Sequence, residues 1–267
     1  MKTAVAMCTY NGEKYLSDQL DSILCQNPLP DQIYVYDDGS GDSTWEILLR
    51  YRTKHPDLFT LLRDGRHRGI NGGMGFLLSR ADADAVFLCD QDDIWMPGKI
   101  KTLLEMADVR PDWHTTPYII HSEARIIPGK PKRRLMSDLI GARRDAPQLE
   151  DLFCHNLVQG CTMLVNRPLL RMISAAVLSR LTHCIYDQWM ALTATAFGCV
   201  LFCPAPLVEY RIHGENTVGT LIIDRHEKNG LSRNRKIACE FLFRYGALLP
   251  DHARRRIRYW IRTGHRQ

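Results

Sequence analysis

The chain lacks the long apolar stretches and paired cysteines that mark several classes of protein. No run reaches the roughly 18 consecutive apolar residues that a membrane-spanning helix needs. The nine cysteines are scattered, and no two of them form a C-x-x-C pair, which favours buried free thiols over a disulfide framework. We therefore expect a cytoplasmic protein, and we interpret the short apolar run at the N-terminus as a strand rather than a signal peptide.

The common glycine-rich phosphate-binding motifs are also missing. There is no G-x-x-x-x-G-K-S/T sequence, and the glycines at 72, 73 and 75 neither fit G-x-G-x-x-G nor follow a clear strand. A phosphate ligand would therefore not be held by a P-loop or a dinucleotide fingerprint. A metal ion is the remaining obvious partner for such a ligand.

Length and charge set only broad limits. The 267 residues, 45% of them hydrophobic, suit one domain with appendages. The formal charge of +5 is a modest excess that does not by itself imply nucleic acid, and it lies largely in "GKPKRR" (129–134) and after Leu231. We interpret the loop 129–150 as a mobile connection, and the basic stretch 130–134 within it fits either a lid over a diphosphate or a solvated turn.

Strand and helix patterns alternate through the first 120 residues. Ser43-Thr44-Trp45-Glu46 resembles a capping box that opens a helix. Such alternation predicts an α/β fold with a mostly parallel sheet covered by helices on both faces. The expected strands are 4–8, 33–36, 59–62, 86–89 and 118–121, and the expected helices are 16–24, 44–54, 72–80 and 97–106. Further along, we expect a helix at 187–196, a strand from about 199 and two helices after 231.

Polar and acidic residues follow three of the expected strands. They are Thr9-Tyr10-Asn11, Asp37-Asp38-Gly39-Ser40 and Asp90-Gln91-Asp92-Asp93. Ligands of parallel sheets bind beyond the carboxyl ends of the strands, so these groups should meet at one edge. Clustered carboxylates repel one another, and a hard cation such as Mg²⁺ or Mn²⁺ resolves that conflict. An acidic turn that caps the following helix fits the third group equally well.

The motifs as a set resemble family 2 glycosyltransferases, which are inverting enzymes of the GT-A fold. The resemblance covers about Met1 to Gly219, and the motif sequences are most similar to those of a bacterial rhamnosyltransferase-like branch. It rests on six stretches in the family's order: "CTYNGEKYLSDQLDSILCQ", "DDGSGDST", "CDQDDIWMPGKI", "GCTMLVNRPLL", "YDQWMALTATAFG" and "YRIHGENTVG".

The resemblance implies a role for each matching residue. For donor binding it implies Thr9, Tyr10, Asn11, Glu13, Asp38, Asp90 and Arg211. For the metal, Mg²⁺ or Mn²⁺, it implies Asp92 and His213, and as assisting residues Asp93 and Trp189. It implies Asp187 as the catalytic base, although a helix N-cap is the alternative role for that residue. The branch often has His-Asp-Trp-Trp where this chain has Tyr186-Asp187-Gln188-Trp189, which leaves the acceptor open.

The resemblance thus implies transfer of a sugar, rhamnose from dTDP-rhamnose in the first instance, to a hydroxyl of a surface-polysaccharide or lipopolysaccharide-type acceptor. UDP-linked glucose, galactose or N-acetylhexosamine are alternative donors. A nucleotidyltransferase and a non-catalytic binding module are less favoured readings. We expect a domain at 1–220, with a donor half at 1–121 and an acceptor half at 122–220, and a basic helical extension at 221–267. The tail's arginines, with Tyr259, Trp260 and Ile261, fit a solvated helix or contact with the inner face of the cytoplasmic membrane.

Overall fold

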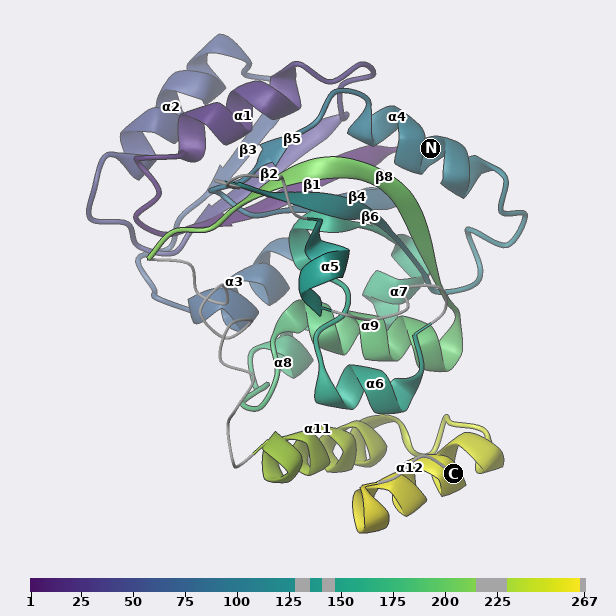
Figure 1. Cartoon of the computed structure of the whole chain (residues 1–267). Coiled ribbons are helices and arrows are strands. Elements are labelled where there is room, and N and C mark those ends of the chain that lie inside the picture. Colours follow the sequence, from purple (N-terminus) through teal and green to yellow (C-terminus); the bar gives the residue numbers. More distant parts are fainter. Residues whose placement is uncertain (128–134, 141–146, 215–229, 265–267) are drawn as a thin grey trace.

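The computed structural model describes residues 1–127, 135–140, 147–214 and 230–264 (Figure 1). An eight-stranded sheet, in the order β3-β2-β1-β4-β7-β6-β8-β5, forms its centre. The strands are β1 (Thr3–Thr9), β2 (Gln32–Asp37), β3 (Phe59–Leu62), β4 (Ala85–Cys89), β5 (Ile94–Trp95), β6 (Tyr118–Ile127), β7 (Met163–Asn166) and β8 (Cys199–Arg211). All five strands expected in the first 120 residues are present.

The sheet is mostly parallel, as the sequence predicts. Strands β3, β2, β1 and β4 pair in parallel, and so do β6 and β8. The two exceptions are β7, which is antiparallel to β4 and β6, and the two-residue β5, which is antiparallel to β8. Because β7 runs the other way, its beginning lies at the edge where β1, β2 and β4 end.

Helices cover both faces of the sheet (Figure 1). On one face lie α1 (Leu16–Leu24), α2 (Thr44–Lys54) and α4 (Lys99–Asp108). On the other lie α3 (Gly69–Leu78), α7 (Arg167–Met172), α8 (Ala175–Leu178) and α9 (Tyr186–Phe197), with α6 (Leu149–Cys154) beside them; α5 (Met136–Ile140) follows β6. Each face has its own hydrophobic core, so β1 and β4 are apolar on both sides.

Helices α11 (Gly230–Tyr245) and α12 (Asp251–Thr263) pack beneath α6 and α9 (Figure 1). Ile257 and Trp260 of α12 are buried, and the Trp260 ring lies 5.3 Å from the Phe153 ring of α6. On the same helix, Arg256 pairs with the buried Glu150 at 2.9 Å. Ile257 and Trp260 of α12 are therefore part of the core of the domain.

The structure corrects two local expectations. Helix α2 starts at Thr44 as expected, but Ser43 forms no side-chain cap bond. Glu13 accepts the Ser43 N–H at 3.0 Å, the donor that Glu46 would take in a capping box. Helix α4 starts at Lys99, two residues later than expected, because Gly98 adopts a left-handed conformation with φ of 83°.

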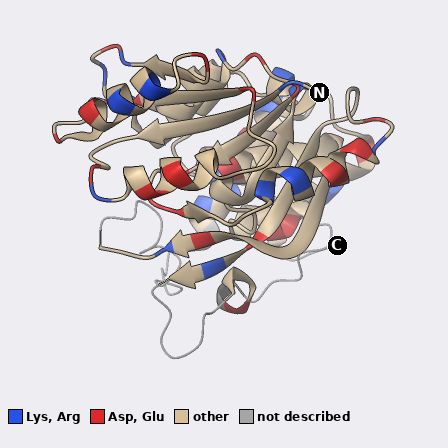
Figure 2. Cartoon of the chain, turned by 90° about the horizontal axis from the view of Figure 1, so that it is seen from above, with Lys and Arg blue, Asp and Glu red and all other residues tan. Residues whose placement is uncertain are grey.

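Charges of both signs are interspersed over the helices and strand ends seen from above (Figure 2). Residues 230–264 nevertheless contain nine Lys and Arg against two Asp and Glu, a formal charge of +7 compared with +5 for the whole chain. Among the described residues, no helix has the length and apolarity required to span a bilayer. The basic stretch 130–134, the end of the "YRIHGENTVG" motif and the expected boundary at 220 lie outside the described residues.

Candidate active site

Three loops interlock where β1, β2 and β4 end. The Gln91 side chain accepts the Tyr10 N–H at 2.9 Å and donates to the Tyr10 carbonyl at 3.0 Å. A Cβ atom at Gly12 would lie 2.3 Å from Gln91 Oε1, so a larger residue there would displace the Gln91 side chain from this pair of bonds. The acidic loop after β4 is thereby fixed against the loop after β1.

The loops after β1 and β2 are joined by side chains that the sequence assigned to donor binding. Asn11, with φ of 48°, donates its N–H to Ser40 Oγ and accepts the Gly41 N–H, both at 2.9 Å. Buried Thr9 donates its hydroxyl to Asp37 at 3.3 Å. Glu13 is exposed and bonded to the start of α2, as described above. Of Thr9, Asn11 and Glu13, only Thr9 lines the cleft described below.

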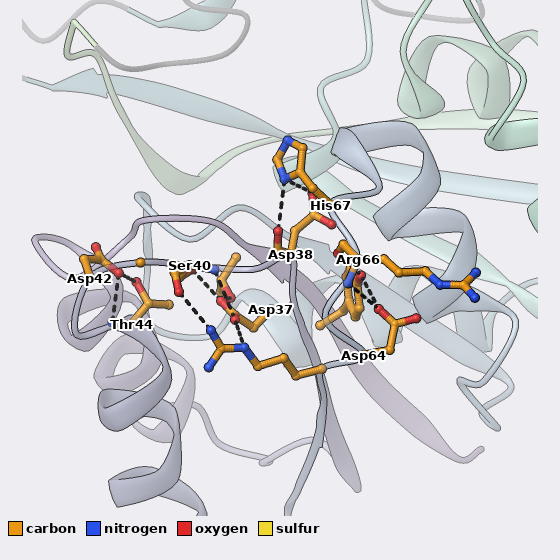
Figure 3. Close-up of polar contacts among 12 residues, drawn as sticks. Asp37, Asp38, Ser40, Asp42, Thr44, Asp64, Arg66 and His67 are labelled. Atoms are coloured by element: carbon orange, nitrogen blue, oxygen red, sulfur yellow. Dashed lines mark hydrogen bonds and ion pairs between the residues drawn. The ribbon is translucent and has the colours of Figure 1, made fainter.

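Asp38, which directly follows β2, lies beside His67 (Figure 3). Its buried carboxylate accepts the N–H groups of Arg68 and Gly69 at the start of α3, and His67 Nδ1 lies 3.1 Å from Oδ2. The Tyr10 ring, 47% of whose surface is exposed, lies 4.7 Å from the His67 ring. A nucleobase could stack on these rings while a ring N–H approaches the carboxylate.

Asp92 and His213 come together from β4 and β8, which are far apart in the sequence. Asp92 Oδ2 lies 2.8 Å from His213 Nε2, and both side chains are largely buried. The Arg211 guanidinium lies 3.2 Å from Asp18 and stacks 4.5 Å from the centre of the Tyr15 ring, on the side of α1. The carboxylate and the imidazole can share a cation, whereas the Arg211 side chain contacts α1.

Carboxylates crowd the end of β4. Burial raises the pKa of Asp90 well above its ordinary value, and the charges of Asp93, Asp92 and Asp187 raise it further. Burial and the charge of Asp92 raise the pKa of Asp93 to about 7, while the Arg211 N–H, 3.0 Å from Asp93 Oδ1, opposes the rise. Such a concentration of negative charge favours a bound cation.

One cation of the protein lies beneath this cluster. Lys99 is fully buried, donates to the Cys161 carbonyl at 2.6 Å and lies 3.9 Å from the centre of the Trp95 ring. Burial lowers its pKa to about 8, and the negative charges of Asp93 and Asp90 oppose that change. Lys99 thus supplies a positive charge to the carboxylates from the side of the core.

Two sets of side chains could hold a metal ion. Ligand atoms of Asp90, Asp93 and Cys161 lie within 4.8 Å of one another. Burial raises the pKa of Cys161 well above its ordinary value, and a neutral thiol is a poor ligand for a hard ion. Asp92 and His213, which offer oxygen and imidazole nitrogen beside Asp90, fit Mg²⁺ or Mn²⁺ better.

Asp187 lies in the first turn of α9 and is 5% exposed. Its Oδ2 accepts from Asn156 Nδ2 at 2.8 Å and from the Gly160 N–H at 3.0 Å, and its Oδ1 accepts the Gln188 N–H at 2.7 Å. Burial raises its pKa to about 6 against these bonds, which lower it. The helix N-cap is Ile185, so the expected alternative of Asp187 as N-cap is wrong.

A cleft connects these groups. A cavity of about 360 Å³ is lined by residues that include Thr9, Tyr10, Asp38, His67, Asp90 and Asp92. A smaller pocket of about 50 Å³ contains Asp187 and Asn156. The two share the lining residues Ile70, Asp90, Tyr186 and Tyr210. A ligand that extends from Tyr10 past Asp92 would therefore reach the pocket of Asp187.

Trp189 does not join the site. It is fully buried, and its ring lies 5.4 Å from Phe241 and 5.9 Å from Tyr245, on the side of α9 that faces α11. Since it is two positions after Asp187, helical geometry turns it away from the base. The structure places Trp189 in the core rather than beside the acceptor pocket.

Several residues at the site were not selected from the sequence. Gln91, Lys99 and Tyr186 lie within the quoted motifs, and their neighbours could have pointed to them. His67 and Asn156 carry no local signal, because the chain brings them to the site from loops outside the motifs. Only their contacts in the folded chain reveal them.

The chain is similar in sequence to known glycosyltransferases. The family described as Glycosyl transferase family 2 matches residues 4–167. The chain is 26% identical over 241 residues to the dTDP-rhamnosyl transferase RfbG of Shigella flexneri, covering 86% of this chain and 80% of the relative. It is 25% identical over 285 residues to the uncharacterized glycosyltransferase alr2836 of Nostoc sp., covering 98% and 84%.

Two solved structures share the fold. Staphylococcus aureus TarS in complex with UDP-GlcNAc has a TM-score of 0.68 at 18% identity, covering 96% of this chain and 70% of that chain. The mannosyltransferase PcManGT from Pyrobaculum calidifontis, in complex with GDP-Man and Mn²⁺, has a TM-score of 0.61 at 17% identity, covering 98% and 70%. These likenesses confirm the expected GT-A fold.

Proposed function

The chain belongs to glycosyl transferase family 2, and on this premise we propose that it is a metal-assisted, inverting transferase of a hexose-type sugar. The donor would be a nucleoside diphosphate sugar. Rhamnose from dTDP-rhamnose is the first candidate, since the relative RfbG is a dTDP-rhamnosyl transferase. UDP-sugars are the alternative, since the similarly folded TarS was solved with UDP-GlcNAc. The acceptor would be a hydroxyl of a surface-polysaccharide or lipopolysaccharide-type glycan.

The observation that carries the proposal is the cleft shared by the nucleotide-binding edge and Asp187. Tyr10, His67 and Asp38 lie together in the main cleft, which Asp90 and Asp92 also line. Asp187 lies in the adjoining pocket. A donor with its base beside Tyr10 and His67 would present its anomeric carbon toward Asp187.

Asp187 suits the role of general base. Its pKa of about 6 keeps it ionised at neutral pH, yet close enough to pH 7 to accept a proton effectively. The acceptor oxygen attacks the anomeric carbon as the carbon–oxygen bond to the diphosphate breaks and its electron pair leaves with the diphosphate. Asp187 takes the proton of the attacking hydroxyl. One displacement inverts the anomeric carbon.

Asp92 and His213 would hold the divalent metal, and the bound ion would stabilise the charge that develops on the departing diphosphate. Their oxygen and nitrogen atoms, 2.8 Å apart in a carboxylate-rich cleft, fit Mg²⁺ or Mn²⁺. Support also comes from PcManGT, which was solved with Mn²⁺. Asp93 would act indirectly, because it is fully buried and accepts the Arg211 N–H.

The two other functional readings have less support. A nucleotidyltransferase would normally carry a glycine- and lysine/arginine-rich loop after β1, where this chain has Thr9 to Glu13. A non-catalytic binding module would not need the base and the metal-binding carboxylate, yet Asp187 and Asp92 both line the connected cavities.

The decisive experiment measures nucleotide binding and turnover. Isothermal titration of dTDP, UDP and GDP, each with Mn²⁺ and with EDTA, should give tighter binding with metal for one nucleotide. Sugar nucleotides of that base should then release nucleoside diphosphate. If no nucleotide binds under either condition, the proposed function is wrong.

We also propose a cytoplasmic location with peripheral contact of the C-terminal segment with anionic membrane. Because Trp260 is buried, this contact would rest on the exposed Arg255, Arg258 and Arg262, which line a surface groove with Tyr259. Changing the three arginines to glutamate should abolish sedimentation with phosphatidylglycerol vesicles and leave the fold intact. Unchanged sedimentation would show that this face of α12 is only solvated. Truncation is unsuitable, because it would remove Ile257 and Trp260 from the core.

A further inference from the structure

Asn156 lies next to the candidate base, although it is 31 positions earlier in the chain, between α6 and β7. Chemistry fixes the orientation of its amide. An ionised carboxylate only accepts hydrogen bonds, so the NH₂ group must face Asp187 Oδ2, at 2.8 Å. The Gly160 N–H donates to the same oxygen, which confirms Oδ2 as an acceptor. The amide oxygen of Asn156 must therefore point elsewhere.

That oxygen has no hydrogen-bond partner within the described parts of the chain, and it is buried. Asn156 and Asp187 both line the pocket of about 50 Å³, which adjoins the main cleft. A buried acceptor without a donor is unfavourable, so an unpaired one in a ligand pocket points to a ligand that donates. The pocket is large enough for a hydroxyl group and too small for a whole sugar.

We propose that Asn156 binds the acceptor, its amide oxygen accepting a hydrogen bond from a hydroxyl adjacent to the one that reacts at Asp187. This inference rests on the proposed function and extends it to the acceptor class. The Asn156 amide donates to the Asp187 carboxylate, so its oxygen lies close to the base, and the hydroxyl that it binds must lie close to the hydroxyl that reacts. The preferred acceptor is therefore a sugar with two hydroxyls on adjacent carbons, one of which attacks while the other binds Asn156.

The test uses the full-length protein and a panel of octyl hexosides, each paired with the derivative that lacks one neighbouring hydroxyl. Asn156→Ala should raise the KM for the acceptor by about tenfold, equivalent to about 1.4 kcal/mol, with the nucleotide Kd unchanged. Removing the correct hydroxyl from the acceptor should raise KM similarly in the wild type. In the variant the same removal should have no further effect, because the two changes delete one interaction.

Asn71→Ala is the matched control. Asn71 also donates its amide NH₂ to two partners, the carbonyls of Leu181 and Cys184, and its amide oxygen too is buried without a partner among the described residues. It lines neither cavity described above. The Asn71→Ala variant should be less stable than the wild type and should have an unchanged KM for the acceptor.

The outcomes separate this inference from the proposed function. If the wild type turns over no sugar nucleotide with any acceptor or with water, both fail. If the wild type is active and Asn156→Ala keeps its acceptor KM, only the inference fails. Additive effects of the variant and the deoxy acceptor, or an equal rise of KM in Asn71→Ala, would also overturn it.

Discussion

Replacing Asp187 by asparagine should separate activity from stability. The side chain keeps its shape and loses its basicity, so turnover should fall by about 10²–10⁴-fold, the usual contribution of a general base. In the wild type only the ionised form acts. With a pKa of about 6, the rate should rise about tenfold per pH unit below pH 6 and level off above it. The rate of the variant should not show this rise with pH.

The stability effect has the opposite sign. The pKa of Asp187 rises from 3.8 to about 6 on folding, so keeping this buried group ionised at pH 7 costs about 3 kcal/mol at 1.36 kcal/mol per pH unit. Asparagine removes that cost. Its NH₂ group would instead face the Gln188 N–H, which donates to Asp187 Oδ1, and two opposed donors cost about 1–3 kcal/mol. The variant should therefore be as stable as the wild type or about 1–2 kcal/mol more stable.

The pH dependence of stability follows from the same shift. Between pH 3.8 and about 6 the folded state holds the Asp187 proton more tightly than the unfolded state. Lowering the pH through this window therefore stabilises the wild type and not the variant. Of the neighbouring groups Asp90, Tyr186 and Cys184, only Asp90 can add to the profile in this window, because burial raises the pKa values of the other two above ordinary values that are already alkaline. Any advantage of the variant at pH 7.5 should shrink by pH 4.5.

Three assays check this reasoning. Nucleotide release measures turnover, titration calorimetry measures donor affinity, and urea unfolding at pH 4.5 and 7.5 measures stability. Asp187→Ala is the contrasting variant, because it leaves the Asn156 amide and the Gly160 N–H without their acceptor and should be less stable. An asparagine variant that transfers sugar at the wild-type rate would refute the assignment of Asp187 as the base.

Three further changes test other parts of the structure. Asp92→Asn should weaken nucleotide binding by about tenfold or more with Mn²⁺ and little in EDTA, measured by calorimetry; equal losses in both conditions would remove its metal role. Lys99→Met should lower the free energy of unfolding by about 1–3 kcal/mol in urea titrations, since it leaves the buried Cys161 carbonyl without its donor, whereas Asp93, with a pKa of about 7, can take up a proton. Trp260→Ala should lower it by about 3–5 kcal/mol, whereas Arg258→Ala, at an exposed position of the same helix, should change it by less than about 0.5 kcal/mol.

The central strands could be predicted because their apolar runs are short, buried on both faces and bounded by polar residues. Once β1, β2 and β4 are parallel, geometry alone gathers Asp38, Asp90 and Asp92 at one edge. What the sequence could not predict depends on distant pairing. Strand β5 has only two residues and exists because β8 pairs with it. The antiparallel direction of β7 likewise has no local signal.

The site residues likewise divide into those that a sequence pattern predicts and those that only the folded chain brings together. His213 reaches Asp92 only because β8 ends beside the β4 loop, and the motif order alone anticipated it. Glu13 and Trp189 show where a motif misleads, because each lies in a matching stretch while its contacts are with α2 and the core. Asn156 shows the reverse, since its role depends on a loop with no distinguishing pattern.

The carboxylates also indicate why a ligand that brings positive charge would suit the proposed site. The pKa of Asp90 is raised by the charges of Asp93, Asp92 and Asp187, and the pKa of Asp93 is raised by the charge of Asp92. Lys99 and a few backbone N–H groups compensate only part of this repulsion, because backbone donors carry partial charges. A divalent ion held by Asp92 and His213 would supply the remainder. In the free protein this repulsion raises the pKa values of Asp90 and Asp93 and so favours their protonated forms. A bound cation would relieve the repulsion, so its affinity would be coupled to the release of protons from these groups.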